Sequence, residues 1–453
     1  MKNPDTSTRL TRRRLLQVGG IGMLGLGLPS LLQATSGSAS PTSRSARTRE
    51  KSCIFIVQYG GASHLDSWDL KPDAPEGIRG PYRPIATSVP GTRIGELLPK
   101  LANMAHRYAL IRSMTHGNGG HDGGMHVCMT GHSAPSSDDP YFGSVVAKVK
   151  PSTVNMPSYV WLQNLAGDVQ PRYLTGGFLG AAYSPLRIST DMDNPAVPGF
   201  RVRAFDTSAD VSRDRLMDRF RLLRRSDPST GSMRLFQERA IDLLTGSEAR
   251  RAFDLDLEST NLRDRYGRHA LGQNLLMARR LIEAGVRLVS ITAWAGLPPG
   301  ERFRNVQTWD MHGEGAGLGS MFGSGAFGLG WALPNVDQSV SALLEDLEVR
   351  GLLENTLVVM VGEFGRSPRI SAAGRDHWPA CYSAMLAGAG IRGGYVHGSS
   401  DHQGSYVRDG AVGPEAFGAT LLHALGIPPE TRLSPDGFTR PASTGRPIAD
   451  LFA

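Results

Sequence analysis

The sequence predicts an α/β fold, built on a mostly parallel central sheet with helices on both faces. The first observation is a set of short apolar runs, each with the length and composition of a strand buried on both faces: Cys53–Tyr59, Tyr108–Ser113, Val286–Thr292 and Leu357–Val361. The second is that longer segments with helical apolar spacing, such as Gly272–Ala284, lie between such runs. The third is length, because about 410 residues (453 minus the first 40) can bury a large core.

Residues 1–40 have the form of an export signal. Thr11–Leu16 is a twin-arginine pattern, and an apolar stretch without a polar face, Val18–Leu32, follows it. That stretch has 15 residues, fewer than the ~20 that a membrane-spanning helix needs. We therefore expect the twin-arginine translocase as an export partner, cleavage near Ala39, residues 41–50 as a linker, and a periplasmic or extracellular protein. A retained signal that acts as an anchor is the alternative.

The charge of the chain gives little reason to expect a nucleic-acid partner. The whole chain carries +7, but residues 1–39 hold five basic residues and one acidic residue, a net +4. The remainder is then +3 (7 minus 4), which is weak for nucleic-acid binding. The cysteines Cys53, Cys128 and Cys381 lie far apart and match no zinc-binding spacing, so we expect buried thiols.

Polar side chains follow the strand predicted at Cys53–Tyr59. Gly60 and Gly61 come first, and glycines there allow a sharp turn or the close approach of another group. His64 and Asp66 then place two metal-ligand types in one short loop. A turn that merely contains Ser and Asp has a similar composition, so a structural role is the alternative.

Histidines cluster after the strand predicted at Tyr108–Ser113. Four of the 12 histidines of the chain fall within 17 residues: His116, His121, His126 and His132. We expect at least one of them to belong to a site, since imidazole serves both as a metal ligand and as an acid or base. The alternative is that these rings cap a helix or bond to backbone groups.

A third polar group surrounds the strand predicted at Leu357–Val361. It consists of Asp310 and His312 before the strand, and Glu363, Arg366, Asp376 and His377 after it. Because functional groups in α/β sheets gather beyond the carboxyl ends of the strands, this group predicts a site for a metal or an anion. The alternative is a surface loop whose charges are solvated.

Six segments carry a family resemblance: GGASHLDSWDLKP (60–72), HDGGMHVCMTGH (121–132), RDRYGRHALGQNLLMARRLIEAGVRLV (263–289), WDMHGE (309–314), GLLENTLVVMVGEFGRSP (351–368) and GRDHWP (374–379). They resemble the DUF1501 family, exported bacterial proteins related to the alkaline phosphatase and sulfatase superfamily, over most of residues 50–440. The resemblance implies an alkaline phosphatase/sulfatase-like α/β fold. We expect a single domain over 51–453 with a helical insertion around 205–285.

The resemblance also implies roles for particular residues. Glu363 stands where sulfatases have a metal-binding aspartate, and Phe364 replaces the histidine that follows it. His121 takes the position of the nucleophile, and Arg366 is a candidate for binding an anionic group, with a salt-bridge role as its alternative. The implied metal ligands are Asp310, His312, Glu363 and His377, with His64 and Asp66 as substitutes for an aspartate pair that Gly60 and Gly61 replace.

Carboxylates mixed with imidazoles suit a divalent metal ion, zinc first, with manganese, iron, calcium and magnesium left open. The leading hypothesis is an exported metal-dependent hydrolase of sulfate or phosphate esters, including esters of polysaccharides. Since His121 is neither an alcohol nor a thiol, a histidine nucleophile or an activated water would replace the usual covalent route. The alternative hypothesis is a non-catalytic relative that binds a glycan or a partner protein.

Overall fold

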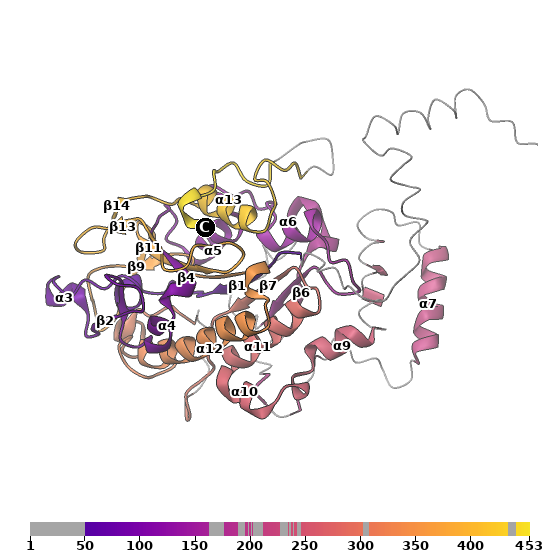
Figure 1. Ribbon diagram of the computed structural model, residues 1–453, viewed down its shortest axis with the longest axis horizontal. Helices are drawn as coiled ribbons and strands as arrows, with labels where there is room; N and C mark the ends of the chain where they lie inside the picture. The colour runs from indigo at the N-terminus through magenta and orange to yellow at the C-terminus, as the bar shows by residue number, and fades with distance from the viewer. Residues whose placement is uncertain are drawn as a thin grey trace, which may run out of the picture. The chain divides into compact units, whose positions relative to one another are not determined.

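The computed structural model describes residues 50–162, 176–188, 246–301, 308–433 and 441–453, with shorter pieces between 195 and 241 that include 212–226. The predicted export signal, residues 1–40, lies outside the described residues. Eight strands form the main sheet (Figure 1): β1 (Ser52–Val57), β4 (Tyr108–Met114), β5 (Tyr159–Leu162), β6 (Leu186–Arg187), β7 (Leu288–Thr292), β8 (Thr356–Val361), β11 (Tyr382–Ala387) and β12 (Val396–His397).

The order of these strands is β12-β4-β11-β8-β1-β7-β5-β6. Only β11 runs against its neighbours β4 and β8, and every other pair in this sheet is parallel. The four apolar runs in the sequence correspond to β1, β4, β7 and β8. The predicted α/β class with a mostly parallel sheet is therefore confirmed.

Helices cover both faces of the sheet, and the side chains of β1 alternate between the two resulting cores. Ile54 and Ile56 enter one core together with residues of α4 (Pro99–Asn103), α9 (Ser247–Phe253), α10 (Thr260–Tyr266), α11 (Ala270–Glu283) and α12 (Leu329–Val349). Phe55 and Val57 enter the other with residues of α5 (His121–Thr130), α6 (Phe142–Val149) and α13 (Pro414–Ala424). A side chain of this size gains about 1.5–3 kcal/mol from full burial, so this alternation fixes the register of the central strand.

Smaller elements complete the described part of the chain (Figure 1): α3 (Glu76–Arg79), α7 (Arg213–Ser226), and the two-stranded pairs β2 (Pro84–Ala86) with β3 (Arg93–Gly95), β9 (Gly365–Arg366) with β10 (His377–Trp378), and β13 (Ser399–Ser400) with β14 (Val407–Asp409). The predicted helical insertion at 205–285 contains α7 and α9 to α11. Nearly all of α11 is buried in the core beside β1 and β7, so this last part belongs to the main helical layer.

Among the described residues, no helix is both long and apolar enough to cross a membrane. Cys53, Cys128 and Cys381 are all buried and free, as the sequence predicts.

Candidate metal centre

The candidate site begins where β1 and β8 end side by side, with Val57 paired to Val361. Beyond β1 the chain turns at Gly60, whose φ of 116° is a conformation that favours glycine. A Cβ atom at Gly60 would lie 2.3 Å from the backbone nitrogen of Asp310. Glycine at this position therefore lets the loop that carries Asp310 pass directly over the end of β1.

Asp310 is the hub of the site, because one of its oxygens faces four nitrogen atoms. Its Oδ1 atom lies 2.8 Å from Arg366 Nη2, 2.9 Å from His312 Nε2, 3.0 Å from His377 Nε2 and 3.3 Å from His121 Nε2. The last of these contacts lacks hydrogen-bond geometry, so His121 Nε2 is a buried nitrogen without a hydrogen-bond partner. His312 Nε2 and His377 Nε2 are themselves 3.0 Å apart.

Each of the three imidazoles is held through its other ring nitrogen. His121 Nδ1 lies 2.7 Å from Glu363 Oε1, His377 Nδ1 lies 2.8 Å from the carbonyl oxygen of Gly119, and His312 Nδ1 lies 3.2 Å from Asp376 Oδ1. These oxygens are acceptors, so each Nδ1 donates its proton to one of them, and each Nε2 faces Asp310. Histidine ligands of metals are oriented in this way.

Three residues form a group that could hold a metal ion: His121, Asp310 and His377, whose ligand atoms all lie within 4.8 Å of one another. In tetrahedral zinc sites, ligand atoms ~2.0–2.1 Å from the metal are roughly 3.3 Å apart. Asp310 Oδ1 lies 3.0 Å from His377 Nε2 and 3.3 Å from His121 Nε2, close to that ligand–ligand separation. His312 lies beside this group. The residues present therefore fit a divalent metal ion.

The electrostatics of the group also favour a cation. Burial alone would lower the pKa of His121, but its close contacts with the carboxylates of Asp310 and Glu363 outweigh burial and raise that pKa to about 9. Burial would raise the pKa of Asp310, yet its contacts with His121, His312 and His377 hold it well below its usual range. Asp310 therefore stays ionised, and the lone pair of His121 is occupied by a proton that a metal ion would displace.

The comparisons with known proteins place the chain in a family. A family model described as a protein of unknown function, DUF1501, matches residues 50–452. The chain belongs to the DUF1501 family. Among proteins of curated function, none matches this DUF1501 chain.

Solved structures that resemble this DUF1501 protein have little sequence in common with it. They include a protein of the alkaline phosphatase superfamily from Vibrio parahaemolyticus, with 10% identity, a TM-score of 0.38, and coverage of 89% of this chain and 71% of that one. A phosphonate monoester hydrolase from Silicibacter pomeroyi has 12% identity, a TM-score of 0.37, and coverage of 89% and 76%. A sulfatase from Pseudoalteromonas sp. has 12% identity, a TM-score of 0.33, and coverage of 89% and 72%.

The sequence predicts Glu363 as a metal ligand. In the DUF1501 protein its carboxylate instead contacts the far ring nitrogen of His121 and the backbone of Gly60. Its side chain is fully buried. Both carboxylate oxygens accept from the backbone N–H of Gly60, at 2.9 and 3.1 Å, and Oε1 also accepts from His121. Glu363 therefore orients His121 and fixes the turn after β1, a role that the sequence motif does not reveal.

The predicted anion-binding role of Arg366 is also contradicted. The guanidinium is fully buried, and it donates to the carbonyl oxygens of Gly60, Gly61, Trp309 and Arg375 as well as to Asp310. With these acceptors in place it cannot reach a substrate. Burial lowers the pKa of Arg366, although the charge of Asp310 opposes this effect. Arg366 positions Asp310.

His64 and Asp66, predicted as further ligands, belong to a separate buried network. Both Asp66 oxygens are bound by Arg375, with 2.8 Å from Nε to Oδ2 and 3.2 Å from Nη2 to Oδ1. His64 Nε2 donates to the carbonyl oxygen of Gly404 at 2.9 Å, and burial lowers the pKa of His64. The loop after β1 thus contributes Gly60 to the metal group, while these two side chains stabilise neighbouring loops.

Three contributors to the site were missed from the sequence. The carbonyl oxygen of Gly119 orients His377, but a backbone acceptor leaves no side-chain signal. His116 bonds to the Glu363 carbonyl oxygen at 2.5 Å and joins the histidine-rich loop to the end of β8. Phe364 packs against two ligand rings, with centroid distances of 4.5 Å to His377 and 5.3 Å to His121. The phenyl ring forms an apolar wall beside these two imidazoles.

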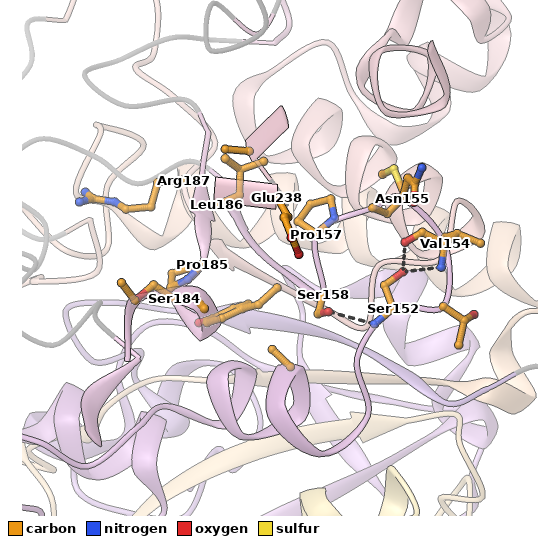
Figure 2. A pocket seen from close by; sticks show the side chains of 17 residues that line it. Ser152, Val154, Asn155, Pro157, Ser158, Ser184, Pro185, Leu186, Arg187 and Glu238 are labelled. Carbon is orange, nitrogen blue, oxygen red and sulfur yellow. Dashed lines mark hydrogen bonds between the residues drawn. The ribbon is translucent and has the colours of Figure 1, made fainter. Parts of the chain in front are cut away.

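A cavity of about 560 Å³ lies elsewhere in the protein (Figure 2). Its lining includes the loop before β5, residues 152–158, and the segment before β6, residues 181–185, so it is at the amino ends of these strands. In Figure 2 the hydroxyls of Ser152 and Ser158 bond within that loop, Ser158 accepting from the Ser152 N–H at 2.9 Å. The metal group lies beyond the carboxyl ends of β1 and β8. This cavity is therefore not part of it.

Proposed function

We propose that this protein is an exported, divalent-metal-dependent hydrolase of phosphate or sulfate esters, including esters carried by polysaccharides. The observation that carries the proposal is the convergence of His121, Asp310 and His377, each ring held through Nδ1 so that Nε2 faces one point. A bound divalent cation, with zinc as the first candidate, would supply Lewis-acid polarisation of a phosphoryl or sulfuryl oxygen and would activate water.

The charge of the site supports the binding of one divalent cation. Asp310, Glu363 and Asp376 contribute −3 and Arg366 contributes +1, so the group carries −2 when the imidazoles are neutral. One divalent ion neutralises that charge. Because Arg366 is committed to Asp310 and to backbone oxygens, the cation would provide the attraction for an anionic ester.

The ligand residues and His312 would have different roles in this reaction. Three protein ligands with an open position are typical of catalytic zinc, and the ligand side chains of His121, Asp310 and His377 keep 14–23% of their surface exposed. His312 is 27% exposed and oriented by Asp376, so its Nε2 atom can hold or release a proton beside the open position. We assign His312 the role of general acid or base, in place of the ligand role predicted from the sequence.

The decisive experiment measures metal content and ester hydrolysis on the same purified, exported protein. We expect about one divalent ion per chain, and turnover of aryl phosphate or aryl sulfate esters that chelation abolishes. Asp310→Asn changes the carboxylate that faces all three imidazoles, so this variant should lose both the bound metal and the ester turnover. Asp122→Asn changes an exposed carboxylate beside His121, and this control should keep the metal and the turnover.

Two outcomes would decide against this function. A wild-type protein that holds no metal and leaves all esters intact would refute it. A wild-type protein that binds the ion tightly but turns over no ester would favour the alternative, a non-catalytic relative that binds a glycan or a partner protein.

A further inference from the structure

The second half of α7, residues 219–226, has the sequence RFRLLRRS, with four arginines and no acidic residue. None of the α7 side chains that the structure describes is buried. Leu222 and Leu223 are 63% and 41% exposed. This segment (Figure 1) plays no part in the metal centre.

Helical geometry places the exposed leucines among the arginines. Residues three and four apart are neighbours on a helix surface, so Arg219 lies next to both Leu222 and Leu223. Leu216 and Phe220 are half-buried, and Leu223, three residues after Phe220, lies on the same apolar stripe of the helix. The exposed end of this stripe, with Leu222 beside it, adjoins the guanidinium of Arg219, whose aliphatic stem can lie along the leucines.

The positive charge of residues 219–226 lies on exposed side chains. This run contains four arginines and no acidic residue, a net +4. Arg221 pairs with Asp218 at 3.0 Å and Arg224 lies 3.6 Å from Glu238, but all four side chains are at least 39% exposed. Exposed pairs of this kind are weak and screened by salt, so they do not neutralise the helix toward an anionic surface.

We propose that Leu222 and Leu223, with the arginines around them, dock this protein on an anionic lipid surface. Basic side chains flanking a small apolar face are what an interfacial helix presents to anionic lipids, with the leucines at the acyl boundary and the guanidinium groups among the headgroups. Exposure alone does not predict this, since Leu257 is 54% exposed but lies between Asp256 and Glu258 and not within a run of arginines.

The test is co-flotation of the full-length exported protein with phosphatidylcholine vesicles, with and without phosphatidylglycerol. We expect binding to the anionic vesicles that weakens with salt. The double variant L222S/L223S should bind them at least about tenfold more weakly, because two apolar side chains are lost. R219Q/R225Q should weaken binding about 25-fold, roughly fivefold for each arginine.

Matched controls separate docking from general damage. Leu257→Ser removes another exposed leucine and Arg408→Gln another exposed arginine, and both variants should bind the vesicles as wild type does. D310N should also bind vesicles as wild type, because docking is independent of the metal centre. Circular dichroism checks that each variant is folded. If L222S/L223S does not fold, the vesicle binding of R219Q/R225Q tests the proposal.

Three results would overturn the proposal. The first is a wild-type protein that binds anionic and neutral vesicles equally or not at all. The second is unchanged binding of L222S/L223S or R219Q/R225Q. The third is a wild-type dimer that L222S/L223S converts to monomer while vesicle binding is unaffected, which would assign the exposed leucines to a second copy of the chain.

Discussion

The substitution Glu363→Gln tests the arrangement of the metal centre most directly. Oε1 of Glu363 accepts from His121 Nδ1 at 2.7 Å and from the Gly60 N–H at 2.9 Å, and Oε2 accepts from the same N–H at 3.1 Å. Glutamine keeps the shape but replaces one acceptor oxygen by a donor and removes the charge. One buried donor, at His121 or at Gly60, then loses its acceptor.

The expected loss follows from these contacts. A hydrogen bond to a charged group contributes about 1.5–3 kcal/mol and a neutral one about 0.5–1.5 kcal/mol, so the orientation of His121 loses about 1–2 kcal/mol. That corresponds to a decrease in metal affinity of roughly 5- to 30-fold, in the range of other residues that orient a ligand. The protein should still fold and still bind the ion.

Competition with a chelator of known affinity measures the loss, with wild type, E363Q and D310N compared under one condition. If E363Q lost the ion as completely as D310N, Glu363 would be a ligand after all. If E363Q bound the ion as tightly as wild type, the hydrogen bond between Glu363 and His121 would contribute nothing to metal affinity.

Other predictions address the supporting structure. Gly60→Ala should abolish metal binding and lower the thermal midpoint, because its Cβ would lie 2.3 Å from the Asp310 nitrogen; Gly91→Ala, also at positive φ but with nothing within 4 Å, should keep the metal. Asp66→Asn should cost about 3–5 kcal/mol in urea unfolding, since it leaves Arg375 buried without its ion pair, yet metal content should not change. Burial lowers the pKa of His269 to about 4, so the unfolded chain binds the extra proton first and stability should fall as pH drops from about 6.5 to 4, by up to about 3 kcal/mol. His269→Gln should flatten that pH dependence of the unfolding free energy.

The central strands could be predicted because their composition follows from burial on both faces. After their first residues, Ser52 and Thr356, β1 and β8 are apolar throughout, since alternate side chains enter two different cores. The site loops could be predicted for a related reason, since Asp310, Glu363 and His377 lie near strand ends in glycine-rich sequence. The sequence thus predicted the region where His121, Asp310 and His377 converge.

The division of roles within that region could not be predicted. Glu363 and Arg366 have the residue types of a ligand and an anion-binding group, but their partners are backbone atoms from distant parts of the chain. Asp66 was misassigned for the same reason, because Arg375, which binds it, lies 309 residues away. A carboxylate or guanidinium shows its chemistry in the sequence, but only the fold shows which partner uses it.

The packing of Phe364 has a consequence for how readily the ion binds. Its ring lies against the His121 and His377 rings, and His377 also lies 4.7 Å from the His312 ring. Rings confined in this way have lost most of their rotational freedom during folding, so little conformational entropy remains to be lost when a cation arrives. Replacing Phe364 with a smaller side chain would leave every donor atom in place and still slow and weaken capture of the ion.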